Sequence, residues 1–186
     1  MHVSHIAARY SKALFTLVLE YNALEEAQKD MVLVSQVCMS NREFRRMLKS
    51  PVINTDKKIN ILKSIFELSV SKLVLTFLLL ITHKKREKYI HEIALEFGEL
   101  YKDHKGIITT QLITAAPVDD EIRRKLTGLM KEYTGATIEL KESVDEELVG
   151  GFILKWKDKQ YDASIESQLN DLMAEVARIN LYKKRL

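Results

Sequence analysis

The sequence predicts a mainly α-helical protein, in which a six-helix bundle over residues 1–105 precedes a small α+β domain over residues 106–186. Two observations lead to this division. Apolar residues recur at helical spacing through the first part, which holds a single proline, Pro51. After Gly106 the chain becomes rich in β-branched residues, and strand-like stretches alternate with helical ones. The expected order of elements in the second part is β-α-β-β-α.

Apolar positions at helical spacing define the first helices, and polar or proline residues mark their ends. Asn41 is expected to cap the third helix, because its side chain can accept hydrogen bonds from free backbone N–H groups. That helix should end near Ser50, since the residue before Pro51 disfavours the α conformation. The apolar positions are Ile6, Tyr10, Leu14, Leu17 and Tyr21 for the first helix, Ala27, Met31, Val34 and Cys38 for the second, and Ile61, Ile65 and Leu68 for the fourth.

Two longer apolar segments predict the fifth and sixth helices. Residues 70–82 are apolar nearly all round, which is typical of a helix at the centre of a bundle. The run 73–81 is much shorter than the about 20 residues that a membrane-spanning helix needs, so a buried helix is expected. Apolar residues from Tyr89 to Tyr101 indicate a long sixth helix.

The second part is predicted from turn residues and from alternating patterns. Gly106 can end the sixth helix in the left-handed conformation, and residues 107–115 then form a strand that Pro117 closes. A helix with apolar positions up to Tyr133 ends at Gly135. Strands follow at 136–144 and 152–156, with a turn near Asp158. Asp162 or Ser164 can cap a last helix, whose apolar stripe is Ile165, Leu169, Leu172, Val176 and Ile179.

Charge and cysteine content exclude some classes of function. The 29 Lys and Arg residues nearly balance the 26 Asp and Glu residues, whereas proteins whose main partner is nucleic acid usually carry a strongly basic face. The single cysteine, Cys38, permits no disulfide within the chain. It lies on an apolar helical stripe, which indicates a small core residue rather than a nucleophile. The sequence holds neither a phosphate-binding loop nor a dinucleotide fingerprint, so we expect no catalytic residue and no cofactor.

Two alternative functions start from residues 83–91. His83, Glu87 and His91 are spaced i, i+4 and i+8, so on one helix they would share a face and could bind a metal in an enzyme. The neighbouring lysines and Arg86 would repel a cation, and we therefore expect a solvated polar face and no metal site. The same basic run, residues 83–88, is the basis for a second alternative, a helical nucleic-acid-binding protein. The run is short, and only Tyr89 supplies an aromatic ring.

The most informative segment is residues 144–164, which combines an acidic lead-in, a diglycine, an alternating strand, a turn and a helix cap. Gly150 and Gly151 permit a positive φ or a close approach of backbone to another element. Carboxylates precede the pair, so anion binding there is not expected. We expect a structural signature, with no chemistry at Gly150, Gly151, Phe152, Asp162 and Ser164.

Five blocks along nearly the whole chain resemble the delta subunit of F-type ATP synthases, the family that includes the oligomycin-sensitivity-conferral protein. The blocks are residues 8–15; residues 48–51 with Lys57, Lys58, Ile61 and Leu62; residues 77–86; Gly106 with residues 114–118; and residues 145–152 with 162–164. The sequence departs from the family pattern at Glu146, where proline is frequent, at Ala163, where a small residue such as glycine is frequent, and at Trp156, which replaces a common aliphatic residue. These changes suit the same turn and strand.

The resemblance implies a non-catalytic stator subunit. Members of this family bind the amphipathic N-terminal helix of an alpha subunit with their helical bundle, and the b subunits of the peripheral stalk with their C-terminal domain. The link keeps the catalytic head from turning with the rotor, so that ion flow is coupled to ATP synthesis. The resemblance also implies one monomeric copy per complex, with no nucleic acid and with membrane association only through the complex.

The family's helix-binding groove lies between the first and fifth helices. By position, the resemblance places Tyr10, Ala13, Leu14 and Leu17 on one wall of this groove. Leu75, Leu79 and Thr82 form the other wall. The alternative for each residue is a place in the core of the bundle. Since the N-terminus shows no transit-type leader, we expect a bacterial protein, peripheral at the cytoplasmic face of the cell membrane.

Overall fold

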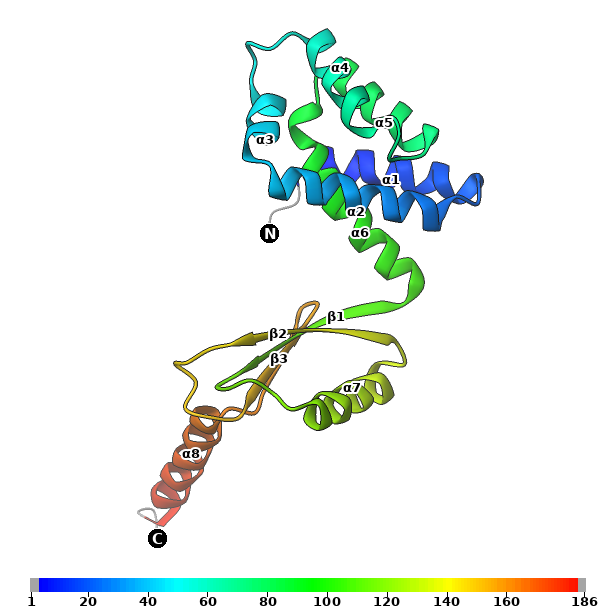
Figure 1. Ribbon diagram of the computed structural model, residues 1–186. Coiled ribbons are helices and arrows are strands. Elements are labelled where there is room, and N and C mark those ends of the chain that lie inside the picture. The colour runs from blue at the N-terminus through cyan, green and yellow to red at the C-terminus, as the bar shows by residue number, and fades with distance from the viewer. Residues whose placement is uncertain (1–3, 184–186) are drawn as a thin grey trace. The chain divides into compact units, whose positions relative to one another are not determined.

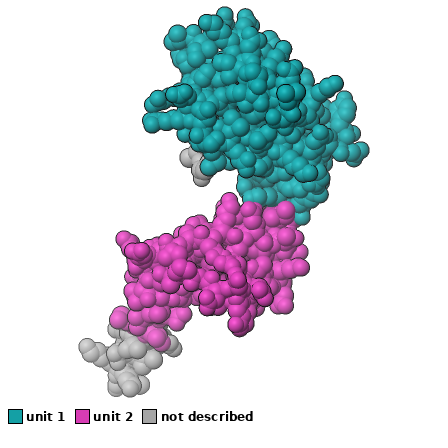
Figure 2. Space-filling model, viewed as in Figure 1, with its two compact units in different colours: residues 1–105 teal, residues 106–186 magenta. Residues whose placement is uncertain are grey.

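The computed structural model describes residues 4–183, and side chains as far as residue 174. The chain divides into two compact units, residues 1–105 and residues 106–186 (Figure 2). Within the described residues the fold is mainly helical, with one small sheet that lies wholly in the second unit (Figure 1).

The first unit is a helical bundle with a break before its last helix. Its elements are α1 (His5–Glu20), α2 (Leu24–Ser40), α3 (Arg42–Lys49), α4 (Thr55–Phe66), α5 (Lys72–His83), the short 3-10 helix η1 (Glu87–Tyr89) and α6 (Ile90–Lys105). Helix α6 packs mainly against α1 and α2, and α5 packs mainly against α4. The break falls at Lys85, whose φ of 56° ends α5 in the left-handed region.

The core of the first unit confirms the predicted stripe of α2 and corrects the predicted face of α4. Ala27, Met31, Val34 and Cys38 are all buried. In α4 the buried face is Lys58, Ile59, Leu62 and Phe66, whereas Ile65 is exposed and Leu68 lies beyond the end of the helix. The prediction chose the wrong face because α4 carries apolar residues on two sides, and the buried lysine concealed the inner one.

Helix ends in the first unit follow the predicted local chemistry. The backbone N–H of Phe44 donates to Asn41 Oδ1 at 2.9 Å, so Asn41 caps α3 as expected. Helix α3 ends at Lys49, two residues before Pro51. Ser71 caps α5, and the Ser71 N–H donates to the buried carboxylate of Asp30 at 2.8 Å, which connects α5 to α2.

The second unit is a four-stranded sheet with one helix packed on it, followed by a long C-terminal helix (Figure 1). Its elements are β1 (Ile107–Thr114), α7 (Asp120–Thr134), β2 (Thr137–Val144), β3 (Phe152–Trp156), β4 (Lys159–Asp162) and α8 (Ile165–Lys183). The strand order is β2-β1-β3-β4, with β1 parallel to β2 and antiparallel to β3. Gly135 ends α7 with φ 67°, as predicted.

The fourth strand corrects the expected β-α-β-β-α order. Strand β4 pairs with β3 at the edge of the sheet, and all four of its residues are exposed. With neither face buried, β4 shows no alternation of apolar and polar residues, so the pattern in the sequence predicted only a turn there. The buried core of this unit is small and is formed by Leu112, Leu126, Met130 and Leu154 from β1, α7 and β3.

Candidate partner-binding sites

Helix α1 exposes part of the face that was predicted to line a groove. Tyr10 is half-buried, Ala13 is exposed, and Leu17 keeps 38% of its surface accessible. These residues are spaced i, i+3 and i+7, so they follow one side of the helix. The buried face of α1 is formed instead by Ala7, Ser11, Leu14 and Val18. A partner could therefore reach Tyr10, Ala13 and Leu17 without opening the core.

Helix α5 offers a second partly accessible stripe. Leu75 and Leu79 are half-buried, lie one turn apart and pack against the core of the unit. Their neighbour Leu80 is 49% exposed, so it extends the accessible apolar surface beside Leu79. Leu75, Leu79 and Leu80 together give α5 an apolar surface that a partner could contact.

Two residues of the predicted groove have no accessible surface. Leu14 and Thr82 are both fully buried. Leu14 belongs to the inner stripe of α1, and the Thr82 hydroxyl donates to the Leu78 carbonyl at 2.8 Å within α5. Both side chains support the helices from the inside, so they do not offer surface to a partner.

The candidate metal ligands lie on three different elements. His83 ends α5, Glu87 begins η1 and His91 lies in α6, because the chain breaks at Lys85. The expectation that they share one helix face is therefore wrong. Glu87 is instead paired with the buried Lys58 at 2.6 Å. Among the described residues, no group of three His, Cys, Asp or Glu side chains could hold a metal ion.

Lys58, which the sequence analysis named only as part of a family block, is a buried cation. It is 3% exposed, and its Nζ donates to the carbonyls of Leu48 and Ser50 as well as to Glu87 Oε1. This side chain therefore fastens the end of α3 to η1. The groups that Lys58 connects, the Leu48 and Ser50 carbonyls and the Glu87 carboxylate, are nearly 40 residues apart in the chain.

The glycine pair holds the sheet close to the start of α8. Gly151 has φ 82°, and a Cβ at this position would collide with the Ala163 carbonyl oxygen and lie 2.9 Å from Ser164 Cα. A Cβ at Gly150 would meet only the flexible end of Ile165, at 2.6 Å. Two backbone hydrogen bonds cross the contact, from Ala163 N–H to the Phe152 carbonyl and from Ile165 N–H to the Gly150 carbonyl.

Asp162 and Ser164 complete this contact by capping α8. The Ser164 hydroxyl accepts from the Ser167 N–H at 3.2 Å, and Asp162 Oδ1 accepts from the Ser164 N–H at 2.9 Å. The hydrogen bonds from Ser164 hold the pKa of Asp162 below its ordinary value. All five signature residues thus lie at one junction, between β3 and α8.

Helix α8 carries an exposed apolar stripe. Ile165, Leu169, Leu172 and Met173 recur at helical spacing, and each is at least 43% exposed. The last two positions of the stripe predicted from the sequence, Val176 and Ile179, lie outside the described side chains. An exposed stripe on a surface helix is a candidate interaction site.

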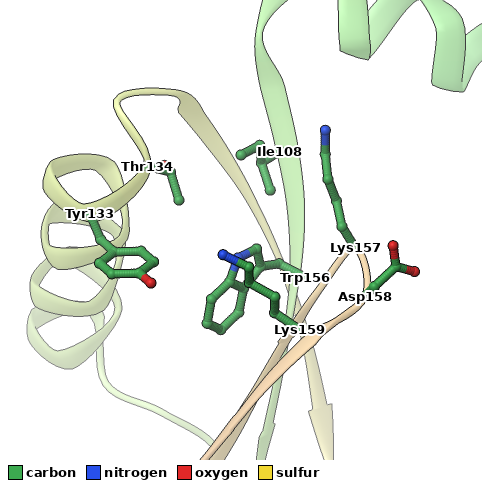
Figure 3. A pocket seen from close by; sticks show the side chains of 7 residues that line it. All are labelled: Ile108, Tyr133, Thr134, Trp156, Lys157, Asp158 and Lys159. Atoms are coloured by element: carbon green, nitrogen blue, oxygen red, sulfur yellow. The ribbon is translucent and has the colours of Figure 1, made fainter.

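A hollow of about 460 Å³ lies at the opposite end of the sheet from α8. Figure 3 shows the side chains that line it. The rings of Tyr133 and Trp156 meet edge to face in it, with centroids 6.2 Å apart. Lys159 lies 6.0 Å from the Tyr133 ring centroid. Trp156 is the single tryptophan of the chain, so its fluorescence reports on this unit.

Comparison with known proteins connects this architecture to one family. The family model described as ATP synthase delta (OSCP) subunit matches residues 6–176. The chain is 32% identical over 172 residues to ATP synthase subunit delta of Cytophaga hutchinsonii, covering 92% of this chain and 94% of that one. It is 35% identical over 161 residues to ATP synthase subunit delta of Chlorobium phaeobacteroides, covering 87% and 89%.

A solved structure has the same fold. One chain of the mitochondrial ATP synthase hexamer of Toxoplasma gondii superposes with a TM-score of 0.75 at 20% identity, covering 94% of this chain and 98% of that chain. The described part of the chain contains no helix that is both long and apolar enough to span a membrane.

Proposed function

Because this chain belongs to the ATP synthase delta (OSCP) subunit family, we propose that it is a non-catalytic stator subunit, which connects the catalytic head of an F-type ATP synthase to the peripheral stalk. The observation that carries this proposal is that the family match runs through both structural units, from residue 6 to residue 176. Two independent units are what a connector needs, since each can bind a different partner.

The first unit would bind the N-terminal helix of an alpha subunit along α1 and α5. Tyr10, Ala13 and Leu17 on α1, with Leu75 and Leu79 on α5, supply partly exposed apolar surface. Ala13 is small and lets a partner helix approach closely. Burying a whole leucine side chain stabilises by about 1.5–3 kcal/mol, so the 38% of Leu17 that remains accessible would contribute roughly 1 kcal/mol. Affinity therefore needs several such contacts together.

The second unit would bind the b subunits through the exposed stripe of α8. This stripe has the spacing of a helix-helix interface, and the glycine contact fixes the start of the helix on the sheet. Ile165, Leu169 and Leu172 are the contacts proposed for the stalk. The protein would then be held at the cytoplasmic face of the membrane only through the complex.

The test measures, by calorimetry, the affinity of the full chain for a synthetic peptide of the cognate alpha-subunit N-terminus. Leu17→Arg and Leu79→Arg should each weaken peptide binding at least tenfold, because each places a charge on apolar contact surface. Leu19→Arg is the matched control: Leu19 is 36% exposed, close to the 38% of Leu17, but lies on another side of α1. It should change the affinity less than twofold.

A second arm separates the two partners. Leu172→Arg on α8 should weaken binding to the soluble domain of the b subunits and leave the alpha peptide unaffected. Equal affinity of wild type and Leu17→Arg for the peptide would contradict the groove, and unchanged b binding by Leu172→Arg would contradict the α8 site.

A further inference from the structure

The first unit carries a strongly basic surface around α3 and η1, away from the exposed face of α1. Helix α3 presents Arg42, Arg46 and Lys49, all exposed, around a hollow of about 350 Å³. A second hollow of about 440 Å³ also includes Lys49 and is lined by Lys85, Arg86 and Lys88 from the turn after α5 and from η1. We call these six residues the basic surface.

The fold assembles this surface from segments that are distant in the sequence. Helix α3 packs against η1, and the buried Lys58 fastens the two by binding the Leu48 and Ser50 carbonyls on one side and Glu87 on the other. The charged groups around the two hollows therefore have a fixed spacing before any partner arrives, which lowers the entropy that binding must overcome.

The charges of the basic surface are not balanced within the described part of the chain. Glu87 is the one described carboxylate that lines either hollow, and Lys58 already neutralises it. Arg42, Arg46, Lys49, Lys85 and Arg86 form no ion pair with any described residue. Concentrated like charge of this kind repels itself and attracts an anionic partner.

The shape of the surface distinguishes between anionic partners. The cations of α3 lie at positions i, i+4 and i+7 and span about 10 Å, two turns of helix. A helix with carboxylates one turn apart matches this spacing. A single strand of nucleic acid needs exposed aromatic rings on which its bases can stack, and Tyr89, the ring at this site, is half-buried beneath Lys88. A lipid surface binds flat faces with exposed apolar residues, whereas these cations surround recesses.

We propose that the basic surface docks an acidic segment of a neighbouring subunit, in which carboxylates recur about one helical turn apart. The identity of the neighbour as a synthase subunit rests on the proposed function, but the recognition rests on the charges and the spacing alone.

The experiment measures fluorescence anisotropy of a labelled 14-residue helical peptide with glutamates at i, i+4 positions, and of its glutamine counterpart, against the full chain. The glutamate peptide should bind at least tenfold more tightly than the glutamine peptide. Raising salt from 50 to 500 mM should weaken this binding at least tenfold. Equal binding of the two peptides would overturn the proposal.

Two variants with equal loss of charge locate the site. The triple variant Arg42→Gln/Arg46→Gln/Arg86→Gln should weaken binding of the glutamate peptide at least tenfold. The control Lys29→Gln/Lys63→Gln/Lys72→Gln removes exposed lysines that line neither hollow and should change the affinity less than twofold. Equal losses in the two triples would mean attraction to net charge only and would overturn the proposal.

A third variant tests the fixed spacing. Lys58→Met/Glu87→Gln keeps all six exposed cations and removes the connection between α3 and η1, so binding should weaken severalfold. Unchanged affinity in the folded double variant, confirmed by circular dichroism, would refute the role of Lys58.

Competing partners are tested with the same protein. The competitors are a 12-nucleotide single-stranded DNA and phosphatidylcholine vesicles with 30% phosphatidylserine. If either binds more tightly than the glutamate peptide, and through the same three arginines, the proposal that the partner is an acidic protein segment is refuted. Leu17→Arg should leave the glutamate peptide bound normally, so a failure of the groove and a failure of the basic surface give different results.

Discussion

The contact between the glycine pair and α8 allows a substitution whose cost can be worked out from the structure. In Gly151→Ala, the new Cβ collides with the backbone of Ala163 and Ser164, which no rotamer change can relieve. The φ of 82° is unfavourable for alanine in addition.

Two terms set the expected loss of stability. A residue with a side chain held in the left-handed region costs roughly 1–2 kcal/mol. Relieving the collision separates residues 150–152 from residues 163–165, which breaks the hydrogen bonds Ala163 N–H to Phe152 and Ile165 N–H to Gly150, at about 1 kcal/mol each. The sum is about 3–4 kcal/mol. For a unit of about 80 residues with a stability of roughly 4–12 kcal/mol, this is a large fraction.

Urea unfolding followed by Trp156 fluorescence measures this loss in the second unit alone, because the first unit has no tryptophan. Substitutions at two other glycines separate the cost of the left-handed backbone from the cost of the collision. Gly135→Ala has φ 67° with nothing near its Cβ, so it should cost only about 1 kcal/mol. Gly128→Ala lies in open space within α7 and should stabilise by about 0.5–1 kcal/mol. A loss in Gly151→Ala no greater than that in Gly135→Ala would refute the reasoning.

Two further predictions concern buried groups of the first unit. Burial raises the pKa of the Cys38 thiol to about 11, so at pH 8 only about one molecule in a thousand carries the thiolate. Its reaction with a thiol reagent should therefore be at least 100-fold slower in the native chain than in urea, and comparable rates would contradict its burial. Lys58→Met leaves Glu87 buried without its cation and should destabilise by about 3–5 kcal/mol in thermal unfolding followed by circular dichroism. Adding Glu87→Gln should recover part of this loss, and a greater loss in the double variant would contradict the ion pair as the cause.

Local chemistry made several parts of the fold predictable from the sequence. Asn41 caps α3 and Gly135 ends α7 because each effect depends on a few neighbouring residues. The stripe of α2 was also correct, since one side of that helix is clearly apolar. Where a segment had two apolar sides, as in α4, or two polar sides, as in β4, periodicity could not identify the buried one.

The interruption after α5 shows a different limit. The sequence predicts a fifth helix over residues 70–82 and a sixth from Tyr89, but the metal alternative needed one helix on which His83, Glu87 and His91 would share a face. Lys58 is one reason why they do not. Its buried ammonium is paired with Glu87, the first residue of η1. A contact between residues 58 and 87 is a tertiary effect, which no local pattern records.

The binding surfaces were the least predictable part, for a physical reason that α8 illustrates. A stripe such as Ile165, Leu169 and Leu172 minimises its exposure equally well against its own domain or against another chain. Its spacing is the same in both cases, so the sequence indicates that the stripe is buried somewhere but not against what. Only the fold reveals that nothing in the described part of this chain covers it. The same argument applies to α1, where Leu14 and Leu17 both belong to the apolar pattern, and burial separates a core residue from a candidate contact.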